Sequence, residues 1–147
     1  MLKETLLEFF ERDLNKLKEE ISLYKNEEDL WIVKNEVSNS AGNLALHLIG
    51  NLNHFIGSIL GKTGYMRDRD SEFSSKNIPK GKIIEGIENV IPIVLNAIKN
   101  LSEEDFNNEF PVDKHGKNVK TDYMLVHLLT HLNYHLGQIN YHRRLLD

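Results

Sequence analysis

The chain has 147 residues, a formal net charge of −4 at pH 7 and no cysteine. This length is typical of a single domain, here residues 1–147, and an apolar fraction of 40% is sufficient for a buried core. The weak negative charge gives no general attraction to nucleic acid or to anionic membranes. The lack of cysteine excludes disulfides, thiolate metal ligands and a cysteine nucleophile. Charges interrupt the apolar run at the N-terminus, so we predict no signal peptide and expect a cytoplasmic protein.

Hydrophobic periodicity predicts long helices in the first half of the chain. Apolar residues spaced by three and four predict a first helix from Leu2 to Tyr24. Residues 26–40 are mixed in character and predict a connection that ends in an N-cap near Ser40. A second helix, residues 41–61, has no charged residue, but its asparagines and histidines argue against a membrane span. Three glycines on one stripe of this helix favour close approach of a neighbouring helix; they are Gly50, Gly57 and Gly61. For Gly61, a glycine that is simply tolerated at the helix end is the alternative interpretation.

The second half of the chain continues the helical pattern after a polar, charge-rich connection at residues 62–80. A third helix is predicted for residues 82–101, with Pro92 removing one of its hydrogen bonds. Residues 102–120 contain a further helical turn and a tight turn. A fourth helix, residues 121–146, begins at a cap on Thr121 or Asp122. The expected fold is therefore an all-α, antiparallel four-helix bundle without strands.

Histidine is unusually frequent, with seven residues, and most of these lie on two predicted helices. On a helical wheel, each of these helices has a polar arc directly beside its apolar face. The polar arc of the last helix consists of His127, His131, His135, Gln138 and His142. That of the second helix consists of His47, Asn51, His54 and Ser58.

Two imidazoles one helical turn apart can reach one ion, and His131 and His135 have the i, i+4 spacing that serves zinc in HExxH helices. A third ligand must come from elsewhere, and the second helix offers His47 or His54. Three neutral imidazoles and water form an open, catalytic type of zinc site, and an octahedral ion with more waters is equally compatible. Spacing does not distinguish a 127/131 pair from a 131/135 pair. A solvent-facing or half-buried histidine pair without metal is the alternative interpretation.

The segment from His127 to Ile139 resembles the C-terminal signature of the DinB-like superfamily, HxxxHxGQ on the last helix of a four-helix bundle. The matching residues are His131, His135, Gly137 and Gln138. Residues 42–54 resemble the second-helix segment that contributes the first ligand in that superfamily. The resemblance therefore implies His47, His131 and His135 as metal ligands, with His54 and His127 beside them or in the pocket.

Two blocks, Asn39–Phe55 and Tyr65–Phe73, also resemble a DinB-like subgroup of unknown function. The superfamily resemblance implies a divalent ion, nickel or zinc first and manganese or iron as alternatives. Some relatives transfer a low-molecular-weight thiol such as bacillithiol to an electrophile, and others resemble mycothiol-dependent isomerases. A bound metal favours the thiolate, which is the nucleophile. A metal-bound hydroxide for hydrolysis is an equally good use of such a site.

Other polar residues admit two interpretations each. Arg67 and Arg69 could grip a substrate carboxylate or phosphate, or form a structural cluster with the neighbouring acidic residues. Asn51, one turn from His47, could bond an imidazole or a substrate, or fill the core. Gln138 could orient a ligand histidine or pack between helices. The acidic residues of the cluster are Asp68, Asp70 and Glu72.

Together with the histidine pattern, the resemblance thus implies a metal-dependent thiol transferase or hydrolase that acts on a small molecule, with its catalytic residues unassigned. The competing classes are a non-enzymatic metal- or ligand-binding bundle in a stress response, and a structural dimer. The apolar stripe of the first helix predicts a homodimer if it is not used by the core. Neither a nucleic acid nor a membrane partner is expected.

Overall fold

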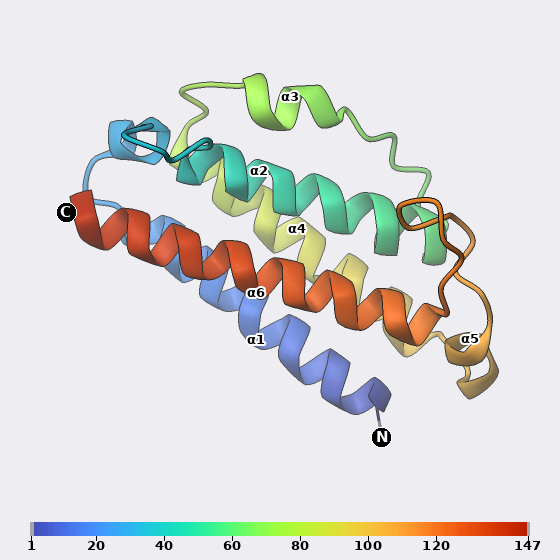
Figure 1. Cartoon of the computed structure of the whole chain (residues 1–147). Helices are drawn as coiled ribbons and strands as arrows, with labels where there is room; N and C mark the ends of the chain where they lie inside the picture. The colour runs from blue at the N-terminus through green and yellow to red at the C-terminus, as the bar shows by residue number, and fades with distance from the viewer. Residues whose placement is uncertain (1, 147) are drawn as a thin grey trace.

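Four long helical segments run side by side in the computed structural model, which describes residues 2–146 (Figure 1). These residues form no strand, and two isolated bridges, Glu109–Lys120 and Lys114–Lys117, are their only β-type pairings. The fold is therefore all-helical, as predicted. In chain order the elements are α1 (Leu2–Ser22), the 3-10 helix η1 (Glu27–Trp31), α2 (Ala41–Leu52), the π-helix η2 (Asn53–Leu60), α3 (Arg69–Ser74), α4 (Lys80–Lys99), α5 (Glu103–Asn107) and α6 (Thr121–Leu146).

The core lies between α1, α2, α4 and α6. Helix α1 packs on α4 and α6, while α2 packs on both α4 and α6 from the other side. The α2 and α6 helices run in opposite directions, as their colours show in Figure 1. The predicted apolar face of α6 is buried, with Leu128, Leu132 and Ile139 no more than 1% exposed. None of the helices in residues 2–146 combines the length and apolarity that crossing a bilayer needs.

The second predicted helix is an α-helix only as far as Leu52. Ser40 caps its start as expected, since the Ser40 side chain accepts from the Asn43 backbone N–H. From Asn53 to Leu60 the chain is a π-helix, whose wider turns are closed by bonds such as Gly61 N–H to Ile56 O at 2.9 Å. Each residue of a π-helix turns by less than the 100° assumed on the wheel. The prediction of one straight polar arc from His47 to Ser58 is therefore wrong beyond Leu52.

The predicted polar connection at residues 62–80 contains a helix that periodicity did not reveal. This is α3, six residues long, whose start is capped by Asp68 accepting from the Ser71 N–H at 3.3 Å. Figure 1 shows α3 lying along the outer side of α2. The stripe of glycines allows this packing and that of α4. A Cβ at Gly57 would lie 2.9 Å from Ile93 of α4, and one at Gly50 would overlap the Glu72 carboxylate of α3.

The remaining elements lie close to their predicted positions. Helix α4 begins and ends two residues earlier than predicted and continues through Pro92. The further helical turn is α5, which Ser102 starts in a capping box with Asp105. Helix α6 begins at Thr121 itself, and the predicted cap is wrong. The Thr121 hydroxyl donates to the Asn108 carbonyl instead, and Asp122 accepts only from the adjacent Tyr123 N–H.

Candidate metal centre

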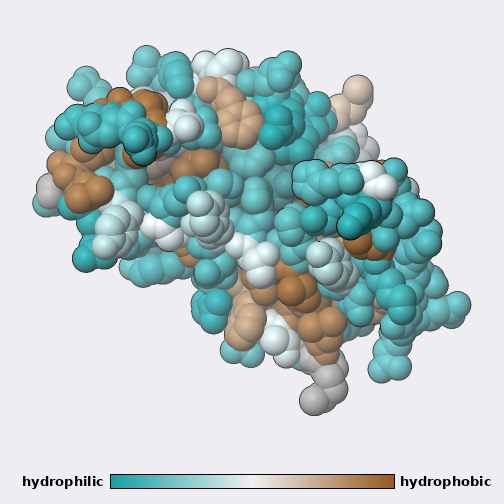
Figure 2. Space-filling model, in the orientation of Figure 1, coloured by the Kyte–Doolittle hydropathy of each residue, from teal (hydrophilic) through white to brown (hydrophobic). Residues whose placement is uncertain are grey.

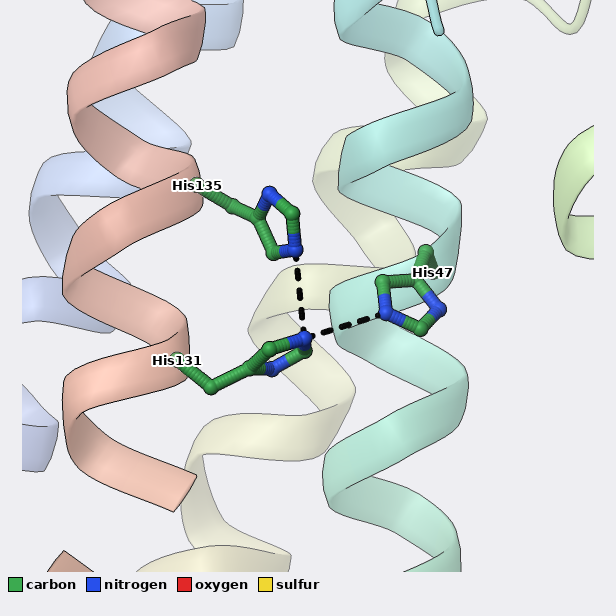
Figure 3. Close-up of side chains that lie close together, drawn as sticks. All are labelled: His47, His131 and His135. Atoms are coloured by element: carbon green, nitrogen blue, oxygen red, sulfur yellow. Dashed lines mark hydrogen bonds between the residues drawn. The ribbon is translucent and has the colours of Figure 1, made fainter. Parts of the chain in front are cut away.

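Three histidines converge between α2 and α6, with His47 on α2 and His131 and His135 one turn apart on α6 (Figure 3). The His131 Nε2 atom lies 3.2 Å from His47 Nε2 and 3.1 Å from His135 Nε2. One nitrogen of each ring lies within 4.8 Å of the other two. No other group of three histidine, aspartate or glutamate side chains converges in this way in the part of the chain that the structure describes.

The hydrogen-bond partners of two rings turn their Nε2 lone pairs toward the centre. His47 Nδ1 lies 3.0 Å from Glu72 Oε1, and His135 Nδ1 lies 2.6 Å from Gln138 Oε1. Each oxygen accepts a hydrogen bond from Nδ1–H, which leaves Nε2 unprotonated and able to bind an ion. The third ring is different, because its Nδ1 is buried without a hydrogen-bond partner. Gln138 therefore contacts His135, a histidine of the cluster.

The donor set and the spacing fit a divalent transition-metal ion. Nitrogen ligands at about 2.0–2.1 Å from an ion are separated by about 3.4 Å in a tetrahedron and about 2.9 Å at adjacent corners of an octahedron. The two Nε2 separations, 3.1 and 3.2 Å, lie between these values. The third pair, His47 and His135, lies within 4.8 Å. Three protein ligands leave at least one coordination position to other ligands in either geometry.

Burial favours the neutral, metal-binding form of two of the three histidines, His131 and His47. Burial lowers the pKa of His131 to about 4, and the neighbouring His135 and His47 reinforce the shift. Burial also lowers the pKa of His47, although Glu72 opposes the shift. His47 and His131 therefore do not need to lose a bound proton to accept an ion at neutral pH.

A carboxylate that the sequence did not single out supports His47. The side chains of Glu72 and Arg67 are 6% and 12% exposed, and Arg67 donates from Nε to Oε2 and from Nη2 to Oε1, both at 2.9 Å. Both oxygens of Glu72 are thus engaged, and Oε1 also faces His47. A carboxylate on the outer nitrogen of a ligating histidine fixes the ring orientation and makes the other nitrogen more basic. The structure therefore places Arg67 in a salt bridge with Glu72.

Helix α3 is held against α2 at the height of the cluster. Asn43, one turn before His47, donates from Nδ2 to the carbonyls of Glu72 and Ser75 at 3.0 and 2.8 Å. The Phe73 ring lies 4.8 Å from the His47 ring, centre to centre. Arg69, in contrast, is exposed and lies over Phe73, 5.1 Å from the ring centre, so the two arginines do not form one cluster.

The other residues of the polar arcs lie outside the cluster. His54 contacts the Phe55 ring, and burial lowers its pKa. The His127 ring stacks at 6.5 Å from that of His131, one turn away from the pair that converges. His142 lies 2.7 Å from the Tyr24 hydroxyl and 2.9 Å from the Ile32 carbonyl, in a separate polar contact. Asn51 is buried, and its Oδ1 has no partner among the described residues.

Comparison with known proteins places the chain in a family. The model of the DUF1572 family, described as a protein of unknown function, matches residues 4–147. The chain belongs to this family, which agrees with its resemblance to a group without an assigned activity. None of the curated proteins matches the sequence.

Proposed function

We propose that this chain is a DinB-like metal protein whose ligands are His47, His131 and His135, and that it uses the bound divalent ion for chemistry on a small molecule. The convergence of three Nε2 atoms carries the proposal, since Glu72 and Gln138 turn two of the lone pairs toward one another. The packing of α1 on α4 and α6, and of α2 on the same two helices, supports a DinB-like four-helix bundle around this site.

The donor set favours zinc or nickel. Imidazole suits zinc, copper, iron and nickel, whereas magnesium, calcium and manganese prefer oxygen ligands. All three ligands of the proposed site are imidazoles, and Glu72 is directed to His47 and Arg67 rather than to the centre. Iron stays compatible with the ligand type, and manganese is the poorest match of the four ions considered.

The residues around the site favour activation of a nucleophile by the ion over catalysis by a carboxylate base. When bound, a divalent ion with an open position lowers the pKa of a coordinated thiol or water. The carboxylate nearest to the cluster, Glu72, has both oxygens engaged by Arg67, so it positions His47 rather than accepting a substrate proton. Phe73 and α3 exclude water from the outer side of His47. This arrangement suits transfer of a small thiol to an electrophile, with hydrolysis as the second use.

Metal analysis of protein purified without a histidine tag tests the site. We expect about one divalent ion per chain, lost in His131→Ala and in His135→Ala, because two remaining ligands hold a solvent-exposed ion poorly. The matched pair is His47→Ala, which should lose the ion, and His54→Ala on the same helical segment, which should retain it. Unchanged metal content in His131→Ala, or loss only in His54→Ala, would refute the ligand assignment.

Enzymatic activity requires a separate measurement. Metal-loaded protein should accelerate consumption of a low-molecular-weight thiol in the presence of a panel of electrophiles, and His135→Ala should abolish the acceleration. If the protein binds the ion with full stoichiometry but accelerates neither thiol transfer nor hydrolysis, a non-enzymatic metal-binding role replaces the enzymatic one.

A further inference from the structure

A cavity of about 750 Å³ opens beside the histidine cluster, between the loop at residues 32–39, the start of α2 and the last turns of α6. This volume is within the range of about 300–1,000 Å³ that is typical of small-molecule sites. Its wall includes His135 and Gln138, which are the third histidine of the cluster and its hydrogen-bond partner. His135 is therefore the side chain that the proposed metal site and the cavity share.

The cluster is covered on one side and borders the cavity on another. Glu72 and Phe73 cover the His47 side through the contacts described above, and Arg67 Nη2 lies 3.4 Å from His47 Nδ1 on the same side. None of these three residues lines the cavity, which lies toward the C-terminal end of α6. A molecule in the cavity therefore meets the cluster from the His135 side.

Most of the surface of the wall is apolar and the wall carries no net charge, although polar side chains such as Asn35, Ser38, Asn39 and Gln138 also line it. Its apolar side chains are Ile32, Val37, Ala41, Leu44, Leu145 and Leu146. The charged residues of the loop, Lys34 and Glu36, have opposite signs. This lining suits an apolar body better than an anion or a polar sugar, because neither a surplus cation nor a cluster of buried donors is present in it.

Apolar side chains at the rim are also left in contact with water. Leu145 is 78% exposed and Val37 is 47% exposed. Figure 2 shows hydrophobic residues at the surface of the end of the molecule that carries the C-terminus. Burying such surface against a ligand is favourable in proportion to the apolar area removed from water.

We infer that this cavity binds the apolar body of the substrate, so that a metal-ligating head group on the same molecule, such as a thiol, reaches the ion past His135. The substrate class is thus a small, uncharged aliphatic or aromatic compound with one metal-binding head. This inference rests on the proposed metal site and adds to it the chemistry of the substrate.

The test uses the cobalt-loaded protein and a series of straight-chain hydroxamates, from acetohydroxamate to octanohydroxamate, with binding followed by the visible absorption of cobalt. The head group is constant across the series, and only the apolar chain grows. If the alkyl chain of the hydroxamate enters the cavity, its affinity for the protein should rise about fourfold for each added methylene. Leu145→Asp, at the rim, should reduce octanohydroxamate affinity at least tenfold and leave acetohydroxamate unchanged. Val126→Asp, an exposed apolar residue of the same helix outside the cavity, is the matched control.

The outcomes separate the two proposals. A spectral change with acetohydroxamate but no gain with chain length overturns the cavity assignment and leaves the open metal site intact. The assignment is also overturned if affinity rises with alkyl-chain length but Leu145→Asp and Val126→Asp change it equally, because the alkyl chain then binds elsewhere. No spectral change with any member of the series overturns the open coordination position and, with it, the substrate class inferred from the cavity.

Discussion

Substituting Gly50 by alanine tests the support of the site without removing any proposed ligand. Gly50 lies on α2, three residues after His47, and faces α3. A Cβ there would lie 2.6 Å from Glu72 Cδ and still closer to Glu72 Oε2, a separation that real Cβ atoms do not show. The carboxylate must therefore move, and His47 Nδ1 loses the acceptor that now lies at 3.0 Å.

The expected size of the effect follows from these contacts. Loss of the partner on the outer nitrogen of a ligating histidine typically lowers metal affinity about 10- to 100-fold. The metal-free protein responds to two opposed effects. Alanine favours a helix over glycine by about 1 kcal/mol, whereas crowding in a packed site costs about 1–3 kcal/mol. We therefore expect Gly50→Ala to lower the free energy of unfolding by up to about 2 kcal/mol.

Gly137→Ala is the matched control. Gly137 lies on α6 between His135 and Gln138, is exposed, and has nothing within 4 Å of the position of a Cβ. This variant should gain up to about 1 kcal/mol in the free energy of unfolding and bind metal as the parent protein does. Affinity is measured by competition with a chromophoric chelator, and stability by urea unfolding of the metal-free protein.

A double-mutant cycle identifies the cause of any loss. In a Glu72→Ala background, Gly50→Ala has no carboxylate to displace, so it should add little further loss of metal affinity. If Gly50→Ala binds metal as tightly as Gly137→Ala, or if the two losses in the cycle simply add, Glu72 does not position His47 and the reasoning is refuted.

Three further predictions follow from the same contacts. Because the pKa of His131 is about 4 in the folded chain and about 6.5 in the unfolded chain, the unfolded state gains its proton first as the pH falls. The free energy of unfolding of the metal-free protein should therefore fall by about 1–2 kcal/mol between pH 6.5 and pH 4. This is less than the pKa difference alone would give, because the ring is partly solvated. In His131→Asn, urea unfolding should show a smaller fall over the same pH range. Chelation should lower the melting temperature without unfolding the protein, because the apolar core contains none of the histidines. Loss of the helical circular dichroism signal on chelation would instead show that the fold depends on the metal. Arg67→Lys should weaken metal binding several-fold, because lysine cannot donate to both Glu72 oxygens in the same way, whereas the exposed Arg69→Lys should not, and equal affinities of the two variants would contradict this.

The sequence by itself determined the features that depend on neighbours along the chain. The spacing of leucines predicted the buried face of α6, because residues three and four apart share a face of any α-helix. The same rule placed His131 and His135 one turn apart on one face. Ser40 could be recognised as a cap because its bond is to a backbone N–H three residues away.

The choice between His47 and His54 depended on the tertiary structure. The two residues lie seven apart, or about 10 Å along a helix axis, and a helical wheel contains no axial coordinate. Only the position at which antiparallel α2 and α6 meet decides whether His47 faces the 131/135 pair or His54 faces the 127/131 pair. The resemblance implied the first arrangement, and the structure has it, with η2 beginning immediately before His54.

The role of the Glu72 carboxylate beside His47 could be predicted from the sequence even less than the choice between His47 and His54. Glu72 is 25 residues from His47 and lies on a helix too short for periodicity to reveal. Its sequence neighbours suggested only a local salt bridge with Arg67, which is indeed present. That this pair is buried against His47 depends on Asn43 holding α3 to α2 and on the lack of a side chain at Gly50. Both are contacts between elements distant along the chain, where local spacing carries no information.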